Sequence, residues 1–213
     1  MLIAACGRPK LFPQTSSMGR LFDGVAALCG LPACVTFEGQ AAMALEFAAD
    51  PDVRDAYPLP LLPVGERGLR RTALPGRPDG PEGPSYVGNS SAGAVTGADP
   101  AVLDWEPMIR AILADRSAGV PVAEIAAHFH NALAVAAVEA ARMVGCPQVV
   151  LSGGCFQNAL LTERVQGALL EAGFRVYLHR EVPPGDGGIA LGQILVATEN
   201  LELGAWNFEH RNL

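Results

Sequence analysis

The sequence predicts an α/β lobe with a mixed sheet flanked by helices, preceded by a helical N-terminal segment and a proline- and glycine-rich loop. An apolar, β-branched run at 148–151 breaks into a Ser-Gly-Gly turn and continues as a helix pattern from Ala159. A strand pattern at 175–179 is likewise followed by a Pro-Pro-Gly-Asp-Gly-Gly turn and a final helix at about 186–199. Strands that alternate with helices across short connections are typical of a layered α/β fold and not of a bundle.

Further helices are expected before and within this alternation. Apolar spacing of three to four residues and the closing Gly30 indicate a helix at about 17–29, with hydroxyl caps offered at 15–17. A second helix at 37–49 is expected to pack against the first as an antiparallel pair. Helices at 104–114, 121–144 and 158–172 follow, the last ending at Gly173. The helix at 121–144 is too apolar for a surface helix and is expected to be buried on most sides.

Composition divides the chain into four regions. We expect a helical segment at 1–50, a Pro/Gly-rich connecting region at 51–100, the α/β lobe at 101–199 and a flexible tail at 200–213. Within the second region, at most short edge strands fit at 57–62 and 68–73. The prolines and glycines at 75–98 cannot sustain a helix or an inner strand and therefore predict a surface loop.

Charge and hydropathy exclude two classes of function. The net charge is −7 and no basic stripe is present, which argues against a protein that binds nucleic acid. No apolar run approaches the ~20 residues needed to span a bilayer, so no membrane association is expected. Because the N-terminus lacks the pattern of a signal peptide, a cytoplasmic location is the default expectation.

Five cysteines without a C-x-x-C pair indicate neither a disulfide framework nor a zinc knuckle. We expect reduced and mostly buried thiols. Cys155 lies beside the glycine pair at a predicted helix N-terminus, where thiolate character could be favoured. The alternative is that this position simply requires a small side chain.

The turn at 152–158 is the leading candidate for ligand binding. A buried strand that breaks into Gly153 and Gly154 and re-forms as a helix exposes backbone N–H groups to an approaching anion. The second turn adds one carboxylate, Asp186, so that together they suggest a nucleotide site. The structural alternatives are a tight turn that needs positive φ at Gly153-Gly154, and an N-cap role for Asp186.

Other polar residues allow both a structural and a functional interpretation. His128 and His130 lie about 200° apart on a helical wheel, so they cannot bind one ion together. We expect one to be buried and hydrogen-bonded and the other exposed, with a direct catalytic role for His130 as the alternative. Asp23 is either a surface residue or a ribose acceptor. Glu38 and Gln40 lie in a solvated first turn or at a cleft wall.

Five segments together resemble the C-terminal part of the hydrogenase maturation carbamoyltransferase family HypF. They are TSSMGRLFD at 15–23, FEGQAA at 37–42, FHNALA at 129–134, LSGGCFQN at 151–158 and PPGDGGIALGQ at 183–193. They occur in the family's order and extend over most of the chain. The resemblance implies part of a Kae1-like domain, which belongs to the actin, sugar kinase and Hsp70-like (ASKHA) group with two lobes around a nucleotide cleft.

The resemblance also implies a reaction and its site. Carbamoyl phosphate and ATP give an enzyme-bound carbamoyl-adenylate, and the carbamoyl group passes to the C-terminal cysteine of a HypE partner, to become cyanide on the iron of [NiFe] hydrogenase. Ser152, Gly153 and Gly154 would hold phosphate oxygens, and Asn158 would help fix the nucleotide. Gly19 and Asp23 would lie near the ribose or base. Asp186 matches the family's ligand to a divalent metal, which could be Fe, Zn or Mg.

The sequence lacks the family's histidine metal motif and upstream domains, so it is expected to form one wall of an active site and to be inactive alone. A separately encoded N-terminal half is a further expected partner. No catalytic residue is assigned. The alternatives are a non-catalytic docking lobe, a degenerate remnant, and a lobe of an O-carbamoyltransferase that acts on a small molecule.

Overall fold

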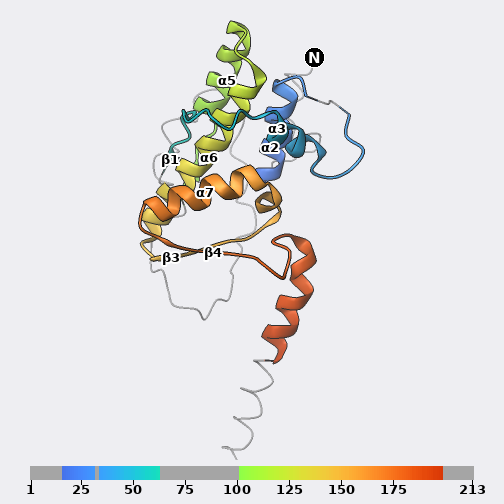
Figure 1. The fold of residues 1–213 in the computed structure, drawn as a ribbon, viewed down its shortest axis with the longest axis vertical. Helices are drawn as coiled ribbons and strands as arrows, with labels where there is room; N and C mark the ends of the chain where they lie inside the picture. The colour runs from blue at the N-terminus through green and yellow to red at the C-terminus, as the bar shows by residue number, and fades with distance from the viewer. Residues whose placement is uncertain (1–15, 32–33, 63–100, 199–213) are drawn as a thin grey trace, which may run out of the picture.

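The computed structural model describes residues 16–31, 34–62 and 101–198. In these residues the fold is mostly helical, with two small sheets (Figure 1). Helices α2, α3, α5 and α6 gather at one end, α7 crosses below them, and strands β3 and β4 lie beneath α7. The loop predicted at 75–98, the edge strand predicted at 68–73 and the tail at 200–213 fall outside the described residues.

Helices α2 and α3 contact each other near the start of the chain. Helix α2 is Met18–Leu28, and Gly30 follows it with a φ of +74°, as expected of a glycine beyond a helix end. Helix α3 is Gln40–Ala48, shorter than predicted because 37–39 form a turn that leads into Gly39 at a φ of +80°. The two helices pack face to face and bury Phe22, Val25 and Leu45.

Helices α5 and α6 supply the rest of the helical core. Helix α5 is Glu106–Ala118 and ends at Gly119 in the left-handed conformation, one turn beyond the predicted end. Helix α6, Val122–Val144, has eleven buried residues, which confirms the prediction of a buried helix. The ring of Phe129 on α6 meets Phe22 edge to face at 4.8 Å between ring centroids, so α2 and α6 share one core.

The described residues hold two separate two-stranded sheets. Strand β1, Leu61–Leu62, pairs antiparallel with β2, Val102–Leu103. Strand β3, Gln148–Leu151, pairs parallel with β4, Arg175–Leu178. The prediction of one mixed sheet is therefore wrong for this part of the chain. The physical reason is that β1 packs on α6 whereas β4 packs on α7, so the two pairs of strands lie against different helices.

Helix α7, Ala159–Glu171, covers one face of the parallel sheet and also packs on α6. Alternation along the strands turns Leu151 and Leu178 toward this helix side, where Leu151 is buried. On the opposite face, the register partners Val150 and Tyr177 are 63% and 44% exposed. Parallel sheets are normally covered on both faces, so this second face is unusually open.

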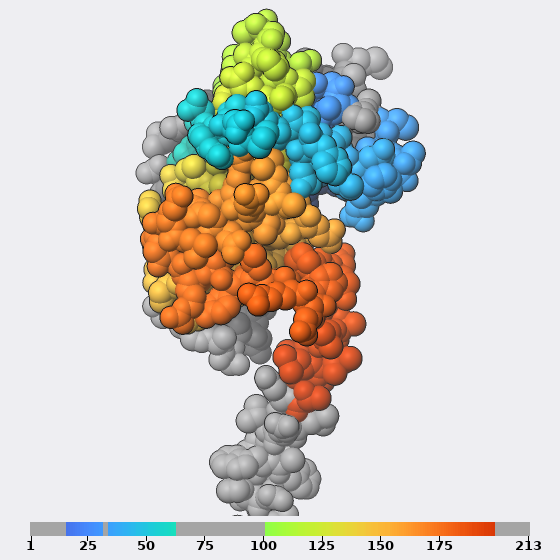
Figure 2. All heavy atoms as spheres, in the orientation of Figure 1, coloured from blue at the N-terminus to red at the C-terminus, as the bar shows by residue number. Residues whose placement is uncertain are grey.

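The C-terminal end of the described chain departs from the body. A single 3-10 turn, η3 (Asp186–Gly188), leads into a helix that covers residues 189–198. Every residue of this helical stretch is exposed, although none of them is charged. Figure 2 shows the helix standing away from the main body instead of packing on it. Among the residues with assigned structure, no helix combines the length and apolar character that a bilayer span requires.

Candidate functional site

The two glycine turns meet at the carboxyl ends of strands β3 and β4. The N–H of Gly153 donates to the carbonyl oxygen of Pro184 at 2.7 Å. A Cβ at Gly185 would lie 2.5 Å from Gln157 Nε2 and 3.6 Å from Gly154 Cα, so the turns are in close contact. In open α/β sheets, ligands bind beyond the carboxyl ends of the strands. The turns therefore stand where this fold class places its ligands.

The two adjacent glycines play different roles in the first turn. Gly153 has a φ of +107°, which a residue with a side chain rarely adopts. Gly154 begins the short 3-10 helix η2 (Gly154–Gln157) without a positive φ, and a Cβ there would meet no atom within 4 Å. The turn thus requires glycine at 153, as the structural alternative stated, whereas the open space at 154 is what a close ligand would use.

Ser152 and His179 lie side by side where the two strands end. Ser152 follows β3, His179 follows β4, and Ser152 Oγ is 3.1 Å from His179 Nε2. Both side chains are exposed. Ser152 is a residue that the sequence predicts at the site, whereas His179 is not. The pairing of β3 with β4 in parallel was the signal that could have found it, because the residues that follow neighbouring strands are adjacent.

The start of helix α7 is not bare, in contrast to the sequence interpretation. Glu46 of α3 accepts hydrogen bonds from Ala159 N at 2.7 Å and Leu160 N at 3.3 Å. Asn158 Oδ1 accepts from Leu161 N at 2.7 Å and so caps the helix. A carboxylate of the protein thus occupies the place proposed for a phosphate at this helix end. Within the turn at 152–158 of the described chain, the N–H groups of Gly154 and Cys155 donate to no protein acceptor.

The side chain of Asn158 is also hydrogen-bonded to a buried histidine, His130. Its Nδ2 lies 3.0 Å from His130 Nε2, and His130 Nδ1 lies 2.7 Å from the carbonyl oxygen of Ala126. His130 is fully buried, and burial lowers its pKa. The expectation of one buried, hydrogen-bonded histidine is confirmed. His128 is half-buried and packs edge-on against Tyr57 at 5.1 Å, so the expectation that it is exposed is wrong.

A second polar network fastens α7 to the segment before β1. Arg164 donates to Asn131 Oδ1 and, at 3.0 Å, to the carbonyl oxygen of Val53. Asn131 itself donates to the carbonyl oxygens of Val53 and Asp55. These contacts join residues far apart in sequence, and neither side chain was singled out beforehand. The network holds the helix whose first residues adjoin the glycine turn.

Asp186 is exposed and begins η3, with Gly185 in the cap position and no side-chain hydrogen bond to the turn. The alternative prediction, that Asp186 is the N-cap of the final helix, is therefore wrong. Within residues 16–31, 34–62 and 101–198, no cluster of three His, Cys, Asp or Glu side chains could hold a metal ion. Since a protein metal site normally needs about three such ligands, the described residues do not form one by themselves.

The two remaining predicted residues lie on α2. Asp23 accepts a hydrogen bond from Arg20 at 3.0 Å and keeps 41% of its side chain exposed. Gly19 lies one turn earlier, and its nearest outside atom is Ser17 Oγ, 3.6 Å from the position of a Cβ. Helix α2 contacts η2, so the helix reaches the glycine turn. The assignment of Gly19 and Asp23 to the ribose or base stays a prediction.

The cysteines differ from expectation. Cys29 is buried and Cys155 half-buried, but Cys34 and Cys146 are exposed, so the described thiols are not mostly buried. Burial raises the pKa of Cys155 above its ordinary value. The interpretation of Cys155 as a small structural thiol is thereby favoured over that of a thiolate.

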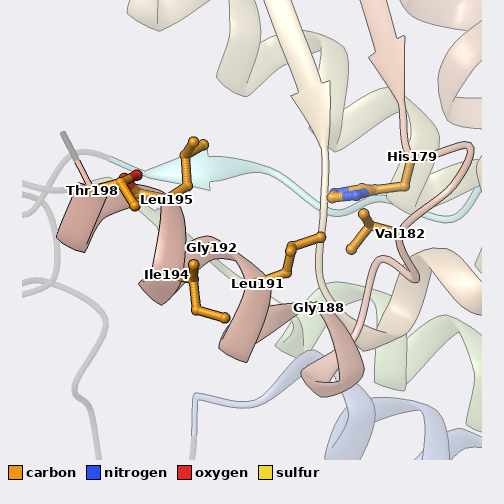
Figure 3. Close-up of a pocket in the computed structure, with 8 residues that line it drawn as sticks. All are labelled: His179, Val182, Gly188, Leu191, Gly192, Ile194, Leu195 and Thr198. Carbon is orange, nitrogen blue, oxygen red and sulfur yellow. The ribbon is translucent and has the colours of Figure 1, made fainter.

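A shallow groove of about 530 Å³ runs from His179 along the exposed C-terminal helix. Figure 3 shows His179 and Val182 at one end and the helix residues Leu191, Ile194 and Leu195 along its length. The groove lining is almost wholly apolar. The apolar groove therefore extends from the helix to the polar side chains of Ser152 and His179 at the strand ends.

The fold and the candidate site define a mostly helical α/β lobe whose glycine turns lie at the carboxyl ends of two parallel strands. Comparison with known families gives the specific assignment. The sequence profile described as "Carbamoyltransferase, Kae1-like Domain, second subdomain" matches residues 3–74 and 83–193. The chain belongs to this family.

Individual relatives agree with the assignment. Carbamoyltransferase HypF of Synechocystis sp. is 38% identical over 183 residues, which cover 86% of this chain and 19% of the relative. HypF2 of Cupriavidus necator is 36% identical over 192 residues, or 88% of this chain and 22% of the relative. The solved structure of full-length HypF in the phosphate- and nucleotide-bound form superposes with a TM-score of 0.68 at 35% identity, covering 88% of this chain and 21% of that one. The chain thus spans about one fifth of these relatives.

Proposed function

We propose that this chain is the C-terminal portion of a HypF-like carbamoyltransferase and contributes one wall of its nucleotide- and phosphate-binding site in the ASKHA-type cleft. The complete enzyme would use carbamoyl phosphate and ATP, through carbamoyl-adenylate, to carbamoylate the C-terminal cysteine of a HypE-like partner. The observation that carries the proposal is the contact between the two glycine turns, Gly153 N–H to Pro184 O, at the carboxyl ends of parallel strands. The related HypF structure that binds nucleotide and phosphate supports it.

The residues of the chain take distinct parts in this proposal. Among the described residues, Ser152 Oγ is hydrogen-bonded only to His179 Nε2, and the N–H groups of Gly154 and Cys155 donate to no protein acceptor. These three groups can therefore meet phosphate oxygens. The N–H of Gly153 is used by Pro184, so Gly153 acts through its backbone conformation. Asp186 would provide one ligand to a divalent metal, and the remaining ligands would come from outside the described residues.

The test compares the 213-residue chain alone with the chain mixed with the preceding part of a full-length relative. Alone, the chain is expected to show no carbamoyl-phosphate-dependent ATP cleavage and at best weak nucleotide binding. With the preceding part supplied, cleavage is expected to appear. Robust turnover by the chain alone would contradict the one-wall interpretation, and no turnover in the mixture would contradict the carbamoyltransferase proposal.

A matched pair of glycine variants sharpens the test. Gly154→Ala has open space for its methyl group and no unfavourable φ, so the chain is expected to remain folded while the methyl group obstructs the approach of a phosphate. Gly167→Ala, on α7, also has open space and serves as the control. Loss of ATP cleavage in the mixture with Gly154→Ala, and not with Gly167→Ala, would support the assignment of the turn.

A second candidate function is docking without catalysis. The exposed helix at 189–198 is uncharged and apolar except for Gln193 and Thr198, and helices of this composition are normally buried. Its groove-facing residues Leu191, Ile194 and Leu195 would then cover a partner. Retention of binding to the preceding part of HypF, with no ATP cleavage in the mixture, would favour this function. A chain that stays monomeric in the mixture would exclude it.

A further inference from the structure

A chain of four hydrogen-bonding groups links helix α6 to the first turn of α7. It runs from the carbonyl oxygen of Ala126 to His130, from His130 to Asn158, and from Asn158 to the N–H of Leu161. The separations are 2.7, 3.0 and 2.7 Å. His130 is fully buried and Asn158 is 8% exposed, so water does not readily substitute for these contacts.

The two end groups of this hydrogen-bond series fix which atom donates and which accepts at each step between them. The Leu161 N–H can only donate, so the atom that faces it is the amide oxygen of Asn158. The amide NH2 of Asn158 therefore faces His130 Nε2, which must accept. His130 is then the neutral tautomer with its hydrogen on Nδ1, and this N–H donates to the Ala126 carbonyl, which can only accept.

From this polarity we infer that His130 is a positioning residue that sets the orientation of the Asn158 amide, so that Asn158 can offer a ligand a donor hydrogen and no acceptor. The amide oxygen is used by Leu161, and one of the two Nδ2 hydrogens is used by His130. The second hydrogen remains. Any ligand group that Asn158 meets must accept a hydrogen bond, as phosphate, ribose and adenine ring-nitrogen acceptors do. The ligand part of this inference rests on the proposed nucleotide site.

Protonation of His130 would reverse the polarity. With hydrogens on both ring nitrogens, Nε2 would donate, and the Asn158 amide would have to turn its oxygen away from Leu161 to accept. The charged groups that bear on His130 are Glu46 of α3 and Arg164 of α7, and they act in opposite directions. From α2 the aromatic ring of Phe22 packs on it at 5.5 Å between ring centroids. The buried surroundings favour the neutral ring that the hydrogen bonds require.

The first experiment measures the tautomer directly. In the 213-residue chain labelled with 15N-histidine, long-range proton–nitrogen spectra at about pH 7.5 should show His130 with a protonated Nδ1 and a bare Nε2. His130→Gln identifies the resonances by their loss, and His128→Gln is the matched control on the same helix. A protonated Nε2 in the wild-type chain would overturn the inference.

A substitution of Asn158 keeps the helix cap while removing the donor. Asn158→Asp retains an oxygen for Leu161 N–H, and Asp is among the best N-cap residues, so the chain is expected to fold. Its carboxylate has no hydrogen for Nε2. The His130 spectrum is therefore expected to change from the bare Nε2 pattern to a protonated one at the same pH. An unchanged His130 spectrum in Asn158→Asp would contradict the role of Asn158 as donor.

The ligand part is tested with inorganic phosphate, a simple acceptor, on the chain alone. The side-chain NH2 signals of Asn158, identified by their loss in Asn158→Ala, are expected to shift during the titration in the wild-type chain. Absence of a shift over the whole titration would overturn the assignment of Asn158 as a ligand donor. This result is separate from the proposed function, which fails only if the mixture with the preceding part of HypF shows no ATP cleavage.

Discussion

The two sides of the glycine turn at 152–158 differ in how fully their polar groups are used. On the side of α3 and α6, Glu46 and Asn158 accept from the first N–H groups of α7, and His130 is hydrogen-bonded to the Asn158 side chain. On the side of the strand ends, the described side chains of Ser152 and His179 are hydrogen-bonded only to each other. The Asp186 side chain has no hydrogen bond among the described residues, and the following helix is exposed. The first side holds the turn in place, and the second keeps its polar side chains exposed.

This difference has a physical basis in burial. Buried polar groups must be paired because water cannot replace a missing hydrogen bond, whereas exposed groups can be left to solvent or to a ligand. Substitutions on the side of α3 and α6, the closed side, are therefore expected to lower the stability of the fold. Substitutions on the side of the strand ends, the open side, are expected to weaken ligand binding. Four predictions follow from this contrast.

Truncating the core of the closed side should have the largest effect. Phe129→Ala removes a fully buried ring that packs edge to face on Phe22, and should lower the free energy of unfolding by about 3–5 kcal/mol. Ile194→Ala, on the exposed helix, should change it by less than about 0.5 kcal/mol. Urea denaturation followed by circular dichroism measures both. Equal losses would show that the exposed helix belongs to the folded core.

Removing the carboxylate that caps α7 should have a smaller effect. Glu46→Ala leaves the N–H groups of Ala159 and Leu160 without their acceptor and should cost about 0.5–2 kcal/mol. Glu38→Ala, an exposed carboxylate just before α3, is the control and should be close to neutral. If the two variants are equally stable in urea, the cap contributes nothing and the closed side is held by packing alone.

Stability should also depend on pH through His130. Burial lowers its pKa in the folded state, so the unfolded chain binds more protons once the pH falls below about 6.5, the ordinary histidine value. The contribution of neutral His130 to the free energy of unfolding is complete above that pH. It is lost as the pH falls toward the lowered pKa, and the free energy of unfolding then changes by at most about 1.4 kcal/mol per pH unit. Urea unfolding at a series of pH values measures the slope.

His130→Gln should flatten this dependence, because it removes the titrating ring. His128→Gln should retain it, since that ring lies half-buried outside the hydrogen-bonded chain. An unchanged slope in His130→Gln would assign the pH dependence to other groups.

Thiol reactivity should show the smallest contrast. The exposed Cys34 and Cys146 should react with a disulfide reagent at neutral pH faster than Cys155, since burial raises the pKa of the Cys155 thiol. Cys29, which is buried and has a raised pKa for the same reason, should be the slowest of the four. Mass spectrometry of the modified peptides resolves each site. Rapid labelling of Cys155 would instead indicate a reactive thiolate beside the glycine turn.

Several features of the molecule could be predicted from sequence because they depend on neighbours in the chain. Strand β3 has the predicted bounds, and α2, α6 and α7 begin and end within one residue of expectation. Gly30, Gly153 and Gly173 all have positive φ, as their places at turns and helix ends indicated. Periodicity and glycine placement act over a few residues, so they are readable without the fold.

Features that join distant segments could not be predicted in the same way. The antiparallel pairing of β1 with β2 across forty residues and the separation of the two sheets depend on which helix each strand covers. His179 and Arg164 gained their places only when parallel pairing and helix packing brought them to Ser152 and Asn131. No local pattern records such a contact.

The sequence by itself determined the glycine turn, the strand before it, the helix after it and the family to which all three belong. Tertiary structure alone decided which N–H groups of that turn have a protein acceptor and which do not. Glu46, 113 residues before Ala159 in the chain, occupies the start of α7, and His130 sets the orientation of Asn158. The reason is that a hydrogen bond is shared between whichever donor and acceptor packing brings together, and packing between helices is a property of the whole fold.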